Sequence, residues 1–204
     1  ALTTGTNAQV DMGTHRTQLL ICQQHQLMFY KYIDIGSEML DAAIARKLSI
    51  TPGEAAAIHA DLGTTNSSMP PASCPITGAE SETPSAPPNH LRQAVLDALR
   101  PSLEELTREL DMCLRYFVVS FRGARPDQLT LSGHMAHDSL LHEYLGSTLG
   151  LPIRALNPLS GISALHQPTR LDRCAEWALA TGLALYALPN QAAPSELAGE
   201  GAAA

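Results

Sequence analysis

The chain has 204 residues, of which 45% are hydrophobic and 16% charged, and its formal net charge is −7. This is enough for one large domain or two small ones with a packed core. The acidic balance excludes nucleic-acid binding, which needs clustered basic residues to neutralise phosphates. No apolar stretch approaches the roughly 20 residues that a membrane-spanning helix needs, so no transmembrane segment is predicted.

The cysteines indicate a reducing environment. Cys22, Cys74, Cys113 and Cys174 are far apart and form no Cys-x-x-Cys pair. Disulfide frameworks usually show denser cysteines in shorter chains. The sequence therefore predicts reduced thiols in a cytosolic protein. The chain opens with neither a secretory signal nor a methionine, which leaves open that it is a fragment of something longer.

Residues 8–35 are predicted to form a three-stranded antiparallel meander. The stretches "AQVDM", "TQLLICQ" and "LMFYKYIDI" are rich in apolar and aromatic residues and are separated by short polar breaks. Between the first two lies Asp-x-Gly-Thr at residues 11–14. Such a turn can cradle a nucleotide phosphate, or it can be an ordinary hairpin.

Two helices are predicted next. Ser37 is the expected N-cap of "EMLDAAIARKL", whose apolar residues recur at helical spacing. Thr51 and Pro52 are expected to begin a second helix, which Gly63 would end. Residues 64–89 are rich in Pro, Ser and Thr and nearly free of large apolar residues. That composition predicts a flexible insertion.

A longer segment is predicted to complete the same domain. It starts with a helical pattern over 90–121, which Pro101 and Ser102 are expected to break into two helices. The strand "DQLTLSG", the helix "HMAHDSLLHEYLGSTLG" and the strand "LPIRAL" follow. Gly150 is expected to end that helix.

The last helical pattern, "RLDRCAEWALATGLALYAL", is apolar on most sides, which predicts a largely buried helix with Trp177 in the core. The Ala/Gly/Pro-rich tail over 189–204 is predicted to be disordered. Residues 8–63 and 90–188 would then form one α/β domain around the insertion at 64–89. Its mixed sheet would contain the antiparallel meander and carry helices on both faces.

The segments in this order resemble the second half of the actin-like ATPase fold, a ribonuclease H-like domain. They are most similar to the PilM family of type IV pilus assembly proteins, which is related to the cell-division protein FtsA. The order of four stretches carries the resemblance more than any one of them does. These stretches are "VDMGTHRTQLLI", "IGSEMLDAAIARKLSITPGEAAAIHADLG", "LEELTRELDMCLRYF" and "DQLTLSGHMAHDSLLHEYLGSTLGLPIRALNPL".

The resemblance implies ATP and Mg²⁺ as ligands. The first stretch would be a phosphate loop whose backbone N–H groups face phosphate oxygens. Asp11 would hold Mg²⁺ through water, because Mg²⁺ keeps much of its hydration. The turn after the fourth strand would lie near the adenosine, at a helix N-terminus. The nucleotide-binding residues implied in this way are Asp11, Gly13, Thr14, His15, Gly36, Ser132 and Gly133.

Departures from the family pattern argue against tight nucleotide binding. The family has Gly-Gly where this chain has Gly133 and His134. Its second helix carries Ala-Glu and then a lysine that hold ribose and adenine, where this chain has Ala55, Ala56 and His59. The first phosphate loop, in the other half of the fold, is absent. We therefore expect this chain to bind ATP weakly or not at all.

Other polar residues suggest chemistry less strongly. Glu109, central in the long helix, could orient a catalytic water, but an ion pair with Arg108 or Arg115 on a solvated face is favoured. Three histidines near residue 140 are interpreted as surface residues of a helix, because no Cys or carboxylate completes a closed zinc site. They are His134, His137 and His142.

The resemblance implies a cytoplasmic scaffold, peripheral at the inner membrane, in type IV pilus or related secretion assembly. Its partners would be inner-membrane proteins with short cytoplasmic tails, and self-association is left open. The alternative is an active actin-like ATPase whose first half is missing here.

Overall fold

The computed structural model describes residues 5–24, 26–64, 89–122, 124–159 and 174–187. Its centre is a five-stranded sheet in the order β3-β2-β1-β4-β5. The first three strands pair antiparallel, whereas β4 and β5 run parallel to β1. This confirms the mixed α/β sheet and its antiparallel meander. The strands are β1 (Thr6–Met12), β2 (Thr17–Gln23), β3 (Gln26–Ile33), β4 (Leu129–Ser132) and β5 (Ile153–Ala155).

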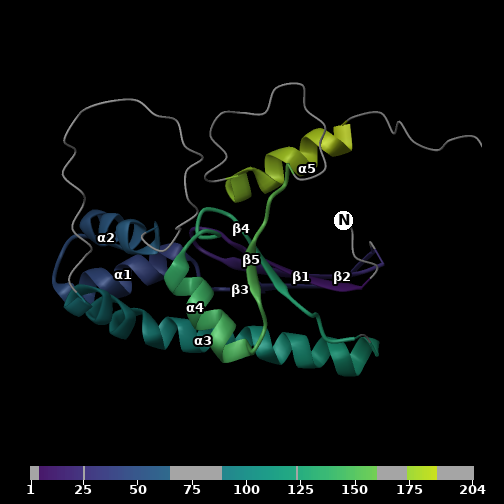
Figure 1. The fold of residues 1–204 in the computed structure, drawn as a ribbon, viewed down its shortest axis with the longest axis horizontal. Coiled ribbons are helices and arrows are strands. Elements are labelled where there is room, and N and C mark those ends of the chain that lie inside the picture. Colours follow the sequence, from purple (N-terminus) through teal and green to yellow (C-terminus); the bar gives the residue numbers. More distant parts are fainter. Residues whose placement is uncertain (1–4, 25, 65–88, 123, 160–173, 188–204) are drawn as a thin grey trace, which may run out of the picture.

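Helices lie on both sides of this sheet. The long helix α3 runs along one side, and α5 lies on the other (Figure 1). Helix α1 packs against α2 and α3, and α4 packs against α2 and α3. The helices are α1 (Ser37–Leu48), α2 (Pro52–Thr64), α3 (Asn89–Phe121), α4 (Ser139–Leu149) and α5 (Ala178–Ala187), the last preceded by a short 3-10 helix, η1 (Cys174–Trp177).

The core lies between the sheet and α3. Ala8, Val10 and Met12 alternate along β1 and are buried, whereas the residues between them are half-buried. Since successive strand side chains point to opposite faces, these three point toward α3. The α3 leucines that meet them in the same cluster are Leu99, Leu103, Leu106, Leu110 and Leu114.

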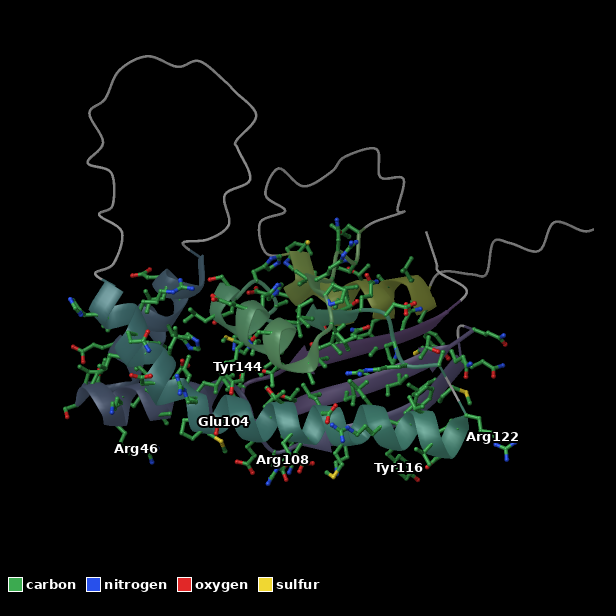
Figure 2. All side chains as sticks on the ribbon, turned by 60° about the horizontal axis from the view of Figure 1, so that its bottom comes forward. Arg46, Glu104, Arg108, Tyr116, Arg122 and Tyr144 are labelled. Atoms are coloured by element: carbon green, nitrogen blue, oxygen red, sulfur yellow. The ribbon has the colours of Figure 1, made fainter. Side chains whose placement is uncertain are left out.

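Helix α3 continues through its proline, so the predicted break at Pro101 and Ser102 is wrong. It spans 33 residues with Pro101 inside it. An internal proline costs a helix about 3 kcal/mol. Leu99 and Leu103 flank the proline and are both buried in the core, so tertiary packing offsets this cost. Figure 2 shows the outer side of this helix, with Glu104, Arg108 and Tyr116 along it.

Several predicted helix starts differ from the observed ones. Helix α4 begins at Ser139 rather than at residue 134, because the Asp138 carboxylate accepts hydrogen bonds from the backbone N–H groups of Leu140 and Leu141 and so caps the helix there. Ser37 is the first residue of α1 and not its N-cap, which is Gly36. At the start of α2, Thr51 and Glu54 exchange hydrogen bonds, as a capping box requires.

The prediction of a largely buried last helix is wrong for the part that the structure describes. No residue of α5 is buried, and Tyr186 is 92% exposed. Trp177, expected in the core, is 56% exposed. A helix that is apolar on every side is expected to be covered, but the pattern does not say by what. The described residues leave most of this helix exposed.

The insertion and the tail lie mostly outside the described residues. At the edges of the insertion, Thr64 is the last residue of α2 and Asn89 the first of α3.

Cys22, Cys113 and Cys174 are free thiols. Across the described ranges, no helix has both the length and the apolar character needed to span a bilayer.

Candidate nucleotide half-site

The predicted site residues of β1 and β4 meet at the carboxyl ends of these strands. Asp11 and Ser132 are opposite each other in the parallel pair. The Ser132 hydroxyl donates to Oδ1 of Asp11 at 2.8 Å and accepts from the side-chain amide of Gln9 at 3.1 Å. Open α/β sheets bind ligands at this end of their strands. The structure thus fixes one carboxylate where a ligand is expected.

Gly133 follows Ser132 in a conformation that requires glycine. Its φ is +86°, and a Cβ atom there would lie 2.6 Å from the Met12 carbonyl oxygen and 3.0 Å from Oδ1 of Asp11. Its N–H donates to the Ala175 carbonyl at 3.2 Å. Gly133 therefore allows the close approach of β4 to β1, and its own N–H is already used within the protein.

The turn between β1 and β2 is a tight hairpin with a partly open tip. The Gly13 N–H closes it by donating to the Arg16 carbonyl at 2.9 Å. Thr14 and His15 form the exposed tip, and their N–H groups have no hydrogen-bond partner among the described residues. Of the three N–H groups that the sequence suggested for phosphate, two are free to bind one.

Helix α1 is docked onto this hairpin. The N–H groups of Ser37 and Glu38 donate to the carbonyls of Gly13 and Thr14 at 3.1 and 3.0 Å. A Cβ atom at Gly36 would lie only 2.2 Å from the Thr14 carbonyl oxygen. Gly36 therefore permits backbone-on-backbone packing. The first N–H groups of α1, which could otherwise attract an anion, are occupied by the protein.

Two histidine side chains close this region further. Nδ1 of His15 lies 2.7 Å from the Glu38 carboxylate, in an exposed pair. Nε2 of His134 lies 2.8 Å from the Ser37 hydroxyl. His134, which stands where the family has the second glycine of this turn, thus links the turn after β4 to the start of α1.

Solved structures with a similar fold can now be compared. A PilM–PilN type IV pilus biogenesis complex matches with a TM-score of 0.64 and 22% identity, over 90% of this chain and 46% of that chain. The fold is actin-like. MreB5 of Spiroplasma citri bound to ADP matches with a TM-score of 0.57 and 12% identity, over 90% of this chain and 54% of that chain. The ethanolamine utilization protein EutJ from Carboxydothermus hydrogenoformans matches with a TM-score of 0.56 and 14% identity, over 89% and 50%.

The chain spans about half the length of the solved structures that it matches. No protein-family model and no curated protein matches its sequence. We refer to the hairpin, Asp11 and the turn at Gly133 as the half-site, the candidate nucleotide-binding part of this fold.

His59 lies in a buried ionic network and not in the half-site. Its Nδ1 is 2.8 Å from Oδ1 of Asp41 on α1, and its Nε2 is 3.0 Å from Oδ2 of Asp138 at the start of α4. The residue is 3% exposed. Burial lowers the pKa of His59, but hydrogen bonds and charge from Asp138 and Asp41 outweigh this effect and raise it to about 9. His59 is therefore an imidazolium at neutral pH, held between two carboxylates.

His59 stands at the sequence position of the family's base-binding lysine, but it is engaged within the protein. Its side chain points into the protein, where it joins α1, α2 and the N-terminus of α4. No sequence signal connects Asp41, His59 and Asp138, because they are far apart in the chain and each has an ordinary local context.

Glu109 is not brought to the half-site. It lies on α3, on the side of the sheet toward which Val10 and Met12 point, whereas the Asp11 side chain points to the other side. Among the described residues, Glu109 forms neither of the ion pairs expected with Arg108 or Arg115, and Arg115 pairs instead with Asp111 at 2.6 Å.

The described residues fit Mg²⁺ only in a limited way. None of their His, Cys, Asp and Glu side chains gather into a group of three or more that could hold a metal. His134 and His137 precede α4 and only His142 lies on it, so the interpretation of the three histidines as residues of one helix is wrong. Mg²⁺ often uses one or two carboxylates together with phosphates and waters. Asp11 fits this mode, in which bound phosphates must supply most of the remaining ligands.

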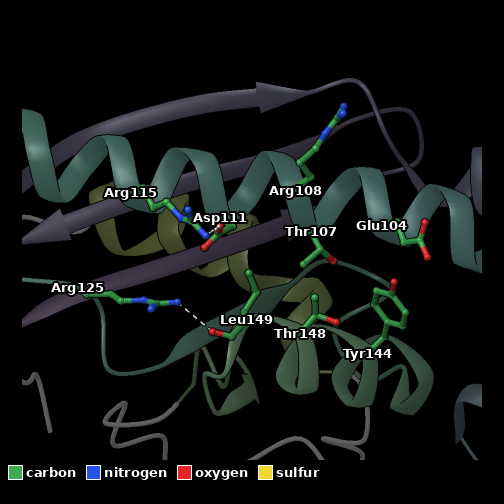
Figure 3. A pocket seen from close by; sticks show the side chains of 9 residues that line it. All are labelled: Glu104, Thr107, Arg108, Asp111, Arg115, Arg125, Tyr144, Thr148 and Leu149. Carbon is green, nitrogen blue, oxygen red and sulfur yellow. Dashed lines mark hydrogen bonds and ion pairs between the residues drawn. The ribbon is translucent and has the colours of Figure 1, made fainter.

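A separate pocket of about 430 Å³ lies between α3 and α4 (Figure 3). It is at the C-terminal end of α4, whereas the half-site is near the N-terminal end. Its walls carry both signs of charge, and Arg125 crosses it to donate to the Leu149 carbonyl at 3.0 Å. The residues that line it are Glu104, Thr107, Arg108, Asp111, Arg115, Arg125, Tyr144, Thr148 and Leu149.

Proposed function

We propose that this chain is part of an actin-like scaffold of type IV pilus or related secretion assembly, in which ATP binding is weak or lost. The docking of α1 onto the hairpin carries the proposal about ATP. It uses the N–H groups of Ser37 and Glu38 within the protein. The half-site then offers a phosphate only two hairpin N–H groups and water-mediated Mg²⁺ at Asp11.

The orientation of His59 supports the same conclusion. The adenine base of a nucleotide needs hydrogen-bonding groups or stacking surfaces that orient it. His59, at the position of the family's base-binding lysine, is instead held by Asp41 and Asp138. A charged group with two buried ionic partners is costly to withdraw from them. His59 is therefore not available to a nucleotide.

The assignment to pilus assembly rests on the similarity to the PilM–PilN complex of type IV pilus biogenesis, in which PilM is bound to a partner protein, PilN. We propose that the protein acts in the cytoplasm, peripheral at the inner membrane, where it binds membrane subunits through their short cytoplasmic tails. Deleting its gene should then abolish surface pili or the related secreted product. Normal pili and normal secretion in the deletion strain would refute this role.

The runner-up function is an active ATPase, completed by the first half of an actin-like fold. Asp11 and the free N–H groups of Thr14 and His15 favour it. Isothermal calorimetry of Mg²⁺-ATP with this chain and with the natural full-length protein separates the two functions. Our proposal predicts no saturation at micromolar ATP. A micromolar dissociation constant that Asp11→Asn weakens would establish the ATPase alternative instead.

A further inference from the structure

An exposed apolar surface lies where the C-terminal third of α3 meets β3, away from the half-site. Val119 is 79% exposed and Tyr116 is 55% exposed. Figure 2 shows Tyr116 and Arg122 toward the C-terminal end of α3. We call this surface the edge patch, and it consists of Phe29, Met112, Tyr116, Val119 and Phe121.

The edge patch is held in place by contacts between its aromatic rings. The ring centroid of Phe29 on β3 is 5.8 Å from that of Tyr116 and 6.5 Å from that of Phe121. Phe121 in turn stacks on the fully buried Phe117 at 5.4 Å. The rings are therefore anchored to the core, which reduces the entropy that binding would cost.

The patch borders an open edge of the sheet. β3 is an outermost strand, and no strand of the described residues pairs with its outer side. Phe29 faces α3, so Tyr30 and Tyr32 face the opposite side. Their rings lie 4.8 Å apart, and both side chains are more than 40% exposed. A strand added along β3 would meet aromatic side chains on both of its faces.

The charge around this edge is opposite to that of the chain as a whole. Residues 17–33 and 112–126 contain no Asp or Glu, although the chain has a net charge of −7. Lys31 and Arg122 make no ion pair with a described residue. Of the nearby acidic residues on α3, Asp111 is paired with Arg115, and Glu109 acts on Cys113 together with Lys31. Among the described residues, the edge therefore carries two cations without an ion pair, Lys31 and Arg122, against one such carboxylate, Glu109.

We propose that the open edge of β3, with the edge patch beside it, binds an extended acidic segment of a partner protein, which adds a strand to the sheet. Backbone groups of β3 would pair with the segment. Apolar side chains of the segment would contact Phe29 and Tyr116 on one face and the two tyrosines on the other. An acidic side chain on the first face would meet Lys31.

Two other occupants fit the surface less well. A second copy of the chain would bring like charges together, because a two-fold contact places the same basic residues on both sides. An anionic membrane can cover the α3 side, but it cannot reach Tyr30 and Tyr32 on the other face at the same time. The proposal depends neither on nucleotide binding nor on the role in pilus assembly.

A fluorescently labelled peptide with glutamate at every fourth position and valine between tests the proposal on the full chain, because as a strand it presents valine on both faces and glutamate on one. We expect this peptide to bind saturably. When lysine replaces glutamate, the peptide should bind at least about tenfold more weakly, which corresponds to a loss of ~1.4 kcal/mol in binding free energy. Val119→Asp and Lys31→Glu should each weaken binding of the glutamate peptide. Lys31→Glu should at the same time strengthen binding of the lysine peptide.

Methylating alternate backbone nitrogens of the peptide should abolish binding for one of the two alternations, because only one set of N–H groups would pair with β3. Arg46→Glu on α1 and Tyr186→Ser on α5 are matched controls that should bind normally, and circular dichroism verifies the fold of each variant.

Equal binding of the two peptides, or no effect of methylation, would overturn the proposal. Binding to vesicles of anionic lipid that Val119→Asp abolishes, with no peptide binding, would assign the edge patch to a membrane. Dimerisation that Val119→Asp abolishes, again without peptide binding, would assign it to a second copy.

Discussion

The buried network around His59 should make the stability of this protein fall as the pH rises above neutrality. The pKa of His59 rises from 6.5 to about 9 in the folded chain. At 1.36 kcal/mol per pKa unit, this corresponds to about 3 kcal/mol of stabilisation. Because the folded-state pKa is the higher one, the stabilisation is complete below pH 6.5 and is lost as the pH rises through 9.

Urea unfolding, followed by far-ultraviolet circular dichroism at several pH values between 6 and 10, measures this loss. We expect the free energy of unfolding to decrease by about 3 kcal/mol across that range. In Asp41→Asn the decrease should be smaller, because one of the two carboxylates that raise the pKa of His59 is gone. The exposed His15 is the matched control, and His15→Ala should keep the wild-type profile.

The substitution His59→Ala tests the same reasoning from the other side. At pH 6 it should destabilise the chain by roughly 3–5 kcal/mol, because it leaves two carboxylates without their cation. It should also remove the pH dependence between 6.5 and 9. A wild-type chain whose stability is flat over this window, or a His59→Ala chain with an unchanged profile, would refute the assignment of His59 as a buried imidazolium.

Three further substitutions test other parts of the fold by the free energy of unfolding in urea. Gly133→Ala should lose about 1–3 kcal/mol, because alanine is strained at φ +86°, whereas Gly182→Ala on α5, where a Cβ meets nothing within 4 Å, should not destabilise. Phe117→Ala should lose about 3–5 kcal/mol through the cavity it leaves in the core. Thr51→Ala should lose about 1 kcal/mol through the broken capping box, and a loss above that of Phe117→Ala would contradict the capping interpretation.

The sequence predicted the parts of the fold that depend on local patterns. Alternation of apolar residues over 8–35 and the glycine after "LTLS" located the meander and β4. Parallel pairing of β1 with β4 then follows from the crossover through the helices between them. This pairing is what brings Ser132 next to Asp11.

The sequence could not predict contacts that join distant residues. The docking of α1 onto the hairpin uses backbone groups, which carry no sequence signal. The start of α4 was misplaced because the capping strength of Asp138 depends on how the preceding turn is packed. For α5, the periodicity described an apolar helix correctly, but it contains no information about the surface that covers it.

The buried ionic network around His59 holds three helices of this actin-like fold together without a ligand. Many two-sided binding proteins rely on the ligand to draw neighbouring elements together. Here a side chain of the protein supplies the positive charge that joins α1, α2 and α4 behind the half-site. These elements are thus held together by charges of the protein itself, so their packing does not require a bound ligand.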